Sequence, residues 1–120
     1  MCLIFVAYKY RPSCELVVAA NRDEFYDRPS AAAEFWKEAP FVLGGKDLMA
    51  GGTWLGITKK GRFAAITNYR DPASHREGAP SRGHLVSNFL TGDDDPGGYL
   101  RRVAPGAAAY NGFSLFVGDR

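Results

Sequence analysis

The stretch that decides the fold consists of residues 2–8, CLIFVAY, and residues 14–20, CELVVAA. Both runs are apolar and rich in residues that favour strands, and a proline-containing turn separates them, so they predict an antiparallel hairpin. Pairing in which residue numbers sum to about 22–23 sets Cys2 opposite Ala20 or Asn21. The polar residues that follow the second strand are therefore expected beside the start of the first.

Cys2 directly follows the initiator methionine. Removal of Met1 would leave a residue with a thiol nucleophile and a free α-amine that can act as its base. The pKa of an α-amine in peptides, about 7.7–8.0, suits proton transfer at neutral pH. The alternative interpretation is a small apolar residue that opens an edge strand, because unpaired cysteines are among the most buried residues.

The composition of the chain is that of one globular domain, residues 1–120, with 46% hydrophobic residues and a net charge of +2. Its charges form no basic stripe, which argues against nucleic-acid binding. The first apolar run is too short to span a membrane and lacks the flanks of a signal peptide, so a cytoplasmic location is expected. Cys2 and Cys14 would lie about 20 Å apart along the hairpin, too far for a disulfide. Neither belongs to a spacing typical of metal ligands.

A second hairpin is predicted from residues 53–58 and 62–68. The pair Gly51-Gly52 before it indicates a tight turn or a close approach of two backbones. Residues 26–46 have an irregular pattern apart from a short apolar stretch at 41–43. No regular element is predicted for most of that region.

Two helices and a strand follow the second hairpin. Ser81 is a candidate N-cap of a helix that ends at Gly92, with its apolar residues on one face. A second, short helix is expected over residues 95–103, with aspartate as its N-cap and proline in its first turn. Residues 113–117 predict another strand. Hairpins that precede helices favour an antiparallel α+β fold.

Polar residues at the strand ends are candidates for a catalytic site. The guanidinium of Arg22 beside a thiol would favour the thiolate, and the carboxylate of Asp23 could hold or orient an amine. The side-chain amide of Asn68 could donate to a developing oxyanion. The alternatives are solvated turn residues and an asparagine that bonds its own backbone. Trp54 is expected to pack in the core or to line a cleft.

Several short motifs together resemble one family. They are Met1-Cys2, the tetrad NRDE at 21–24, GTWLG at 52–56, TNYR at 67–70, SRG at 81–83 and NGF at 111–113. In this order, over essentially the whole chain, they look like the NRDE family, also called the transport-and-Golgi-organisation family. The resemblance implies an N-terminal-nucleophile (Ntn) hydrolase-like fold, four-layer αββα. Family members are longer, so this fold would be incomplete here and further site residues would lie beyond Arg120.

A more distant similarity connects the chain to choloylglycine hydrolases and penicillin V acylases. It implies a cysteine amidohydrolase or thioesterase that cleaves acyl C–N or thioester bonds without a metal or catalytic cofactor. The residues that match in kind and order are Cys2, Arg22, Asp23, Asn68 and Tyr69. The candidate catalytic residues are therefore Cys2, Arg22, Asp23 and Asn68, and the candidate substrate-binding residues are Asn21, Trp54 and Tyr69. In those enzymes the arginine and aspartate are separated by two residues, whereas here they are adjacent.

The family resemblance also implies an alternative without catalysis. In that case the same fold would serve haem trafficking or the homeostasis of lipids and acyl-coenzyme A. The expected partners are then a small-molecule acyl substrate or haem, with no nucleic acid and no transmembrane segment, and an oligomer is left open.

Overall fold

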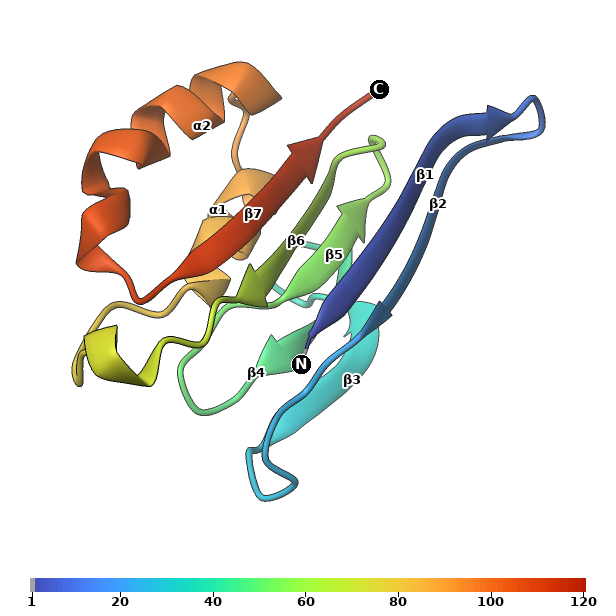
Figure 1. Ribbon diagram of the computed structural model, residues 1–120. Coiled ribbons are helices and arrows are strands. Elements are labelled where there is room, and N and C mark those ends of the chain that lie inside the picture. Colours follow the sequence, from blue (N-terminus) through green and yellow to red (C-terminus); the bar gives the residue numbers. More distant parts are fainter. Residues whose placement is uncertain (1) are drawn as a thin grey trace.

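An antiparallel five-stranded sheet forms the centre of the structure, a computed structural model that describes residues 2–120 (Figure 1). Its strands, in spatial order, are β3 (Ser30–Phe35), β4 (Val42–Asp47), β5 (Leu55–Thr58), β6 (Phe63–Asn68) and β7 (Phe113–Gly118). A separate hairpin pairs β1 (Leu3–Arg11) with β2 (Cys14–Asn21). The predicted α+β class with antiparallel strands is therefore confirmed.

The helices cover one face of this sheet (Figure 1). They are α1 (Gly83–Thr91) and α2 (Pro96–Val103), with short 3-10 helices at Pro72–Ser74 and Ala104–Ala109. The apolar face of α1 packs on β4 to β7, where Val86, Phe89 and Leu90 are fully buried. The approach is close, because a Cβ at Gly56 would lie 2.6 Å from Cδ1 of Leu90 and would displace the end of that side chain. The hydroxyl of Tyr99 joins the two helices by donating to the carbonyl oxygen of Leu85 at 2.6 Å.

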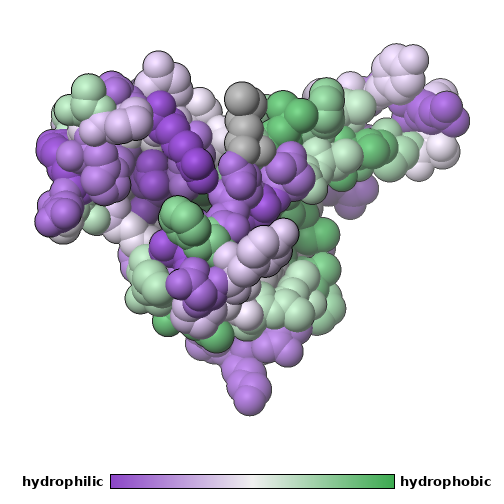
Figure 2. Space-filling view, turned by 60° about the horizontal axis from the view of Figure 1, so that its bottom comes forward, coloured by the Kyte–Doolittle hydropathy of each residue, from purple (hydrophilic) through white to green (hydrophobic). Residues whose placement is uncertain are grey.

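The β1–β2 hairpin lies over the other face of the sheet and extends beyond it (Figure 1). Ile4 and Val18 face the sheet, while Leu3, Phe5 and Val17 alternate to the outside and are 46%, 65% and 51% exposed. Figure 2 shows hydrophobic surface along this projecting hairpin. The described residues thus form a helix layer, a sheet and a hairpin, and none of them covers the outer face of the hairpin.

The register of the hairpin differs from the prediction. Leu3 pairs with Asn21 and the residue numbers sum to 24, so the same register would bring Cys2 opposite Arg22. The difference arises at the turn, which is tighter than predicted: Arg11 pairs with Cys14, and these numbers sum to 25. One extra residue in the first strand then lowers the sum to 24. Lys9 adopts a left-handed φ of 50° at this bulge. Both cysteines are free, in agreement with the expected absence of a disulfide between them.

Two further expectations were wrong. The region 26–46, predicted to be irregular, contains β3 and β4. Ser81 does not cap α1: Arg82 occupies the N-cap position without a side-chain hydrogen bond. The second hairpin, the end of α1 at Gly92, the Asp95 cap of α2 and the strand at β7 are confirmed.

Candidate functional site

A polar cavity of about 210 Å³ lies at the open end of the hairpin, between it and the five-stranded sheet. The predicted site residues that line it are Cys2, Asn21, Arg22, Asp23, Trp54 and Asn68. Tyr69 lines a neighbouring cavity instead. Residues far apart in the sequence therefore meet in this cavity. The hairpin register brings Cys2 beside the residues that follow β2, and the end of β6 brings Asn68.

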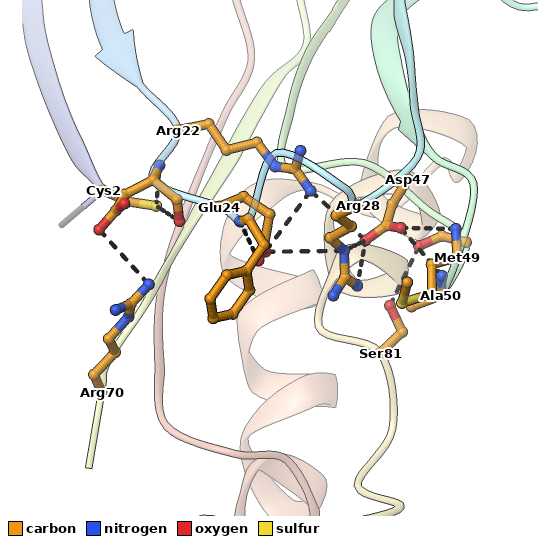
Figure 3. A network of polar contacts seen from close by, with 12 residues as sticks. Cys2, Arg22, Glu24, Arg28, Asp47, Met49, Ala50, Arg70 and Ser81 are labelled. Atoms are coloured by element: carbon orange, nitrogen blue, oxygen red, sulfur yellow. Dashed lines mark hydrogen bonds and ion pairs between the residues drawn. The ribbon is translucent and has the colours of Figure 1, made fainter. Parts of the chain in front are cut away.

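The thiol of Cys2 contacts the backbone at the end of β2. Its Sγ accepts a hydrogen bond from the backbone N–H of Asp23 at 3.3 Å and donates to the carbonyl oxygen of the same residue at 3.8 Å. An N–H that points at sulfur stabilises the negative charge of a thiolate. The carboxylate of Asp23 pairs with Arg70 at 3.6 Å (Figure 3). Asp23 thus contributes its backbone to the thiol and its side chain to the end of β6.

Arg22 has a different position from the one expected. Its guanidinium stacks on the ring of Trp54, 4.2 Å from the ring centre. It points toward Glu24 and Asp47, whose carboxylates lie 3.8 and 4.0 Å away (Figure 3). Between residues 2 and 120, no arginine hydrogen-bonds the Cys2 sulfur. Trp54 also packs against the core cluster, so it both lines the cavity and supports it.

Asp47 is the centre of the ion-pair network beside the cavity. Its Oδ2 accepts from Nε and Nη2 of Arg28 at 3.1 and 2.7 Å, and its Oδ1 accepts from the backbone N–H groups of Met49 and Ala50 (Figure 3). Burial would raise the pKa of Asp47, but these hydrogen bonds outweigh it and hold the pKa below its ordinary value. The same pair raises the pKa of Arg28.

The loop after Asp47 holds the segment that begins α1. Gly51 and Gly52 both have left-handed φ values, 74° and 76°, and a Cβ on Gly52 would lie 2.3 Å from the carbonyl carbon of Gly83. Ser81 donates from Oγ to the carbonyl oxygen of Gly51 at 3.2 Å. Both expectations for the glycine pair, a tight turn and a close approach, are confirmed.

The end of β6 provides the opposite wall. Asn68 is exposed and lines both the polar cavity and its neighbour. The following backbone is fixed by a hydrogen bond from the N–H of Tyr69 to the carbonyl oxygen of Gly112 at 2.9 Å. Asn111 holds the adjoining loop because its side chain accepts from the N–H of Arg76 and donates to its carbonyl oxygen. An amide at position 68 is therefore carried on a well-supported strand end.

Arg82 lies half-buried between the two cavities. Its Nη1 donates to the carbonyl oxygen of Gly112 at 2.8 Å. Within residues 2–120, no carboxylate lies at ion-pair distance from it. Burial lowers its pKa and the charge of Arg28 lowers it further, while Glu24 and Cys2 act in the opposite direction.

Sequence reasoning missed Arg28, Asp47 and Arg82 as parts of this site. A short-range signal existed for Asp47, since an aspartate before a turn often accepts from the next backbone N–H groups. Arg82 lay within the SRG motif but had no assigned role. No group of three or more metal-ligating side chains occurs in the part of the chain that the structure describes. Nor does any helix in that part have the length and apolar character to cross a membrane.

Comparison with known proteins places this chain in a family. The model of the family described as "Transport and Golgi organisation 2" matches residues 1–120. The chain belongs to the Transport and Golgi organisation 2 family. The chain is 47% identical over 126 residues to the Transport and Golgi organization protein 2 homolog of Bos taurus, covering 99% of this chain and 45% of that protein.

Other members of the Transport and Golgi organisation 2 family show the same coverage. The human homolog is 45% identical over 126 residues, covering 99% of this chain and 45% of that protein. The protein from Drosophila melanogaster is 32% identical over 127 residues, covering 96% and 44%. The chain thus spans less than half the length of these curated relatives.

Proposed function

We propose that this family member is a cysteine hydrolase with an Ntn-hydrolase-like fold, in which Cys2 is the N-terminal nucleophile. The observation that carries the proposal is the contact of the Cys2 sulfur with the backbone N–H of Asp23 inside a cavity that Asn68 also lines. The substrates would be acyl amides or acyl thioesters, which makes the protein an amidohydrolase or thioesterase.

The reaction starts after removal of Met1. The α-amine of Cys2 takes the thiol proton, and the thiolate attacks the acyl carbonyl carbon to form a C–S bond. The side-chain amide of Asn68 donates to the oxygen that becomes negative. The C–N or C–S bond to the leaving group then breaks, and the amine returns the proton to that group. Water hydrolyses the acyl-cysteine to a carboxylic acid and restores the thiol.

The surrounding residues hold the site in place. Arg22 and Arg28 share the carboxylates of Glu24 and Asp47, so they have positioning roles and do not touch the thiol. Trp54 and Asn21 would contact the substrate, because both line the cavity. Tyr69 would contact only a substrate that extends into the neighbouring cavity.

The test is hydrolysis of a panel of acyl amides and acyl thioesters by the intact protein, with Met1 removal verified by mass. Cys2→Ala is expected to abolish turnover, and Cys2→Ser to retain little of it, because a hydroxyl is a weaker nucleophile. Asn68→Ala should lower turnover by about 10²–10³-fold. Cys14→Ala is the matched control and should keep full activity. Turnover that persists in Cys2→Ala would eliminate the proposal.

A second candidate function is a carrier without catalysis, favoured by an apolar groove of about 650 Å³ between the hairpin and the sheet. Its walls include Leu16, Val18, Ile57, Phe63 and Phe116. Because its walls are mainly apolar, this groove suits an acyl chain. Among the described residues that line it, Tyr8 is of a type that can ligate haem iron, and none is His, Cys or Met. If the protein is such a carrier, Cys2→Ala leaves ligand transfer unchanged and no acyl substrate turns over.

A further inference from the structure

The charges that line the polar cavity do not all pair within it. Its walls carry the guanidiniums of Arg22, Arg28 and Arg82. Arg22 and Arg28 both lie at ion-pair distance from Glu24 and Asp47, so these two cations and two anions balance. The third carboxylate of the wall, Asp23, pairs with Arg70, which lies outside this cavity. The balanced group leaves Arg82 as a separate cation of the cavity wall.

The guanidinium of Arg82 also has more N–H donors than its hydrogen bond to the protein uses, so it can donate to a ligand. A guanidinium has five N–H donors in a planar fork, and one group of Arg82 donates to the carbonyl oxygen of Gly112. That bond anchors the side chain at the boundary of the two cavities, in the wall that also includes Cys2. A guanidinium that keeps N–H donors for a ligand binds carboxylates and phosphates through two parallel hydrogen bonds.

We propose that Arg82 binds an anionic group of the substrate, a carboxylate or a phosphate, next to the carbonyl that Cys2 attacks. This inference rests on the proposed function, because it assigns the substrate class of the same site: acyl compounds that carry a negative charge near the scissile bond. Arg82 is thereby a specificity-determining residue. The paired arginines of the cavity cannot replace it without giving up Glu24 or Asp47.

The experiment compares two alkylating agents of similar size at Cys2, the anionic iodoacetate and the neutral iodoacetamide. The ratio of their rates removes any change in the amount of thiolate, since the same thiolate attacks both. Mass spectrometry of peptides from the intact protein, with Met1 removed, measures Cys2 and Cys14 in one sample. Cys14, which lies outside the cavity, serves as the internal control for the reagents.

We expect Arg82→Gln to lower the iodoacetate-to-iodoacetamide ratio at Cys2 by about fivefold, since a charge-assisted hydrogen bond to the carboxylate is lost. Arg82→Lys should retain most of the ratio, because it keeps the charge. Arg101→Gln is the matched control, an exposed arginine on α2 whose loss should not change the ratio. An unchanged ratio in Arg82→Gln, or an equal fall in Arg101→Gln, overturns the inference.

A measurement without variants covers the case in which Arg82→Gln fails to fold. Succinate and phenyl phosphate are added separately to the unsubstituted protein, and protection of Cys2 from iodoacetamide is measured against neutral succinamide. Protection by succinate identifies a carboxylate as the bound group, and protection by phenyl phosphate identifies a phosphate. Protection by neither overturns the inference. Because alkylation needs no turnover, this result is independent of whether Cys2→Ala abolishes hydrolysis.

Discussion

At the scale of the residue, the two cysteines differ in their surroundings. The Cys2 thiol lies in the polar cavity, where its sulfur accepts from the N–H of Asp23 and donates to the carbonyl oxygen of the same residue. Cys14 lies outside that cavity, at the turn of the hairpin, and its thiol donates to the carbonyl oxygen of Leu16 at 3.4 Å. A backbone N–H directed at the sulfur and a free α-amine both assist attack by the Cys2 thiol.

Cys2 should therefore react with iodoacetamide faster than Cys14 at pH 7 once Met1 is removed. The rates are obtained for both residues from one folded sample by peptide mass spectrometry, and a sample in denaturant gives the reference at which the difference disappears. Equal rates in the folded protein would argue against an activated nucleophile.

Asp47 gives a prediction for the pH dependence of stability. The folded pKa of its carboxyl lies below the unfolded value, so its contribution is fully present above about pH 4 and is lost as the pH falls through the folded pKa. Asp47→Asn should lower the free energy of unfolding by about 2 kcal/mol at pH 7, since charge-assisted hydrogen bonds with Arg28 are lost. Urea titrations at pH 7 and pH 3 test this.

The difference in the free energy of unfolding between Asp47→Asn and the unsubstituted protein should be smaller at pH 3 than at pH 7. Asp93→Asn, at an exposed position on the loop between the helices, is the control and should change stability little at either pH. A difference in the free energy of unfolding that is the same at pH 7 and at pH 3 would show that the charge of Asp47 does not stabilise the loop.

At the scale of the element, the contact between the Gly52 turn and the start of α1 fixes the wall of the site. Gly52→Ala would bring a Cβ to 2.3 Å from the Gly83 carbonyl carbon, in addition to the cost of its left-handed φ. Gly78 has a similar φ of 74° but nothing within 4 Å of its Cβ position, so Gly78→Ala isolates the cost of the conformation.

We expect Gly78→Ala to lower the free energy of unfolding by about 1 kcal/mol. Gly52→Ala should lower it by about 3 kcal/mol, because the backbone of α1 must move as well. Chemical denaturation of the two variants provides the comparison. Similar losses in both would mean that the turn and the helix can separate without cost.

Whether a strand could be predicted from the sequence depends on whether a local residue pattern or long-range contacts stabilise it. β1, β2, β5 and β6 carry apolar or β-branched residues at strand spacing, which the sequence displays directly. β3 and β4 contain the alanines 31–33 and the pair Gly44-Gly45, which have little strand propensity. Gly44 is a strand residue because it packs on the backbone of Gly56 and Leu55, and such long-range contacts leave no local pattern.

The site, too, could be predicted from the sequence only in part. Cys2, Arg22 and Asp23 follow from the hairpin alone, although the turn is tighter than predicted and changes the register. The pairing of Arg22 with Trp54 and Asp47, in place of the thiol, depends on how the hairpin lies over the sheet. That arrangement is a tertiary property, as is the position of Arg82.

At the scale of the whole molecule, apolar side chains remain uncovered on two surfaces. Leu3, Phe5 and Val17 lie on the outer face of the hairpin, and Ile57 and Phe116 are 43% and 45% exposed on the sheet. Contiguous apolar surface of this kind is uncommon on soluble monomers. The 120-residue chain alone should therefore associate, or require further chain to cover these faces.

Light scattering and the binding of a fluorescent apolar dye test that expectation. The double substitution Phe5→Ser and Val17→Thr on the outer face should reduce both signals, while Tyr26→Ser, also exposed but outside both surfaces, should not. A monodisperse monomer of the unsubstituted 120-residue chain that binds no dye would contradict the expectation.

The contacts that connect the hairpin to the sheet have one more consequence. Arg22 on Trp54, Arg70 with Asp23 and Arg120 with Glu15 join the two parts, and all three depend on a guanidinium. Two of them, Arg70 with Asp23 and Arg120 with Glu15, are exposed ion pairs, which weaken as ionic strength rises, whereas the packing of α1 on the sheet does not. An isolated hairpin is only marginally stable. In 1 M sodium chloride, amide hydrogen exchange should quicken in β1 and β2 and stay slow in β6. Because Cys2 and its Asp23 donor move with the hairpin while Asn68 and Arg82 stay with the sheet, salt would control the fraction of molecules whose site is assembled.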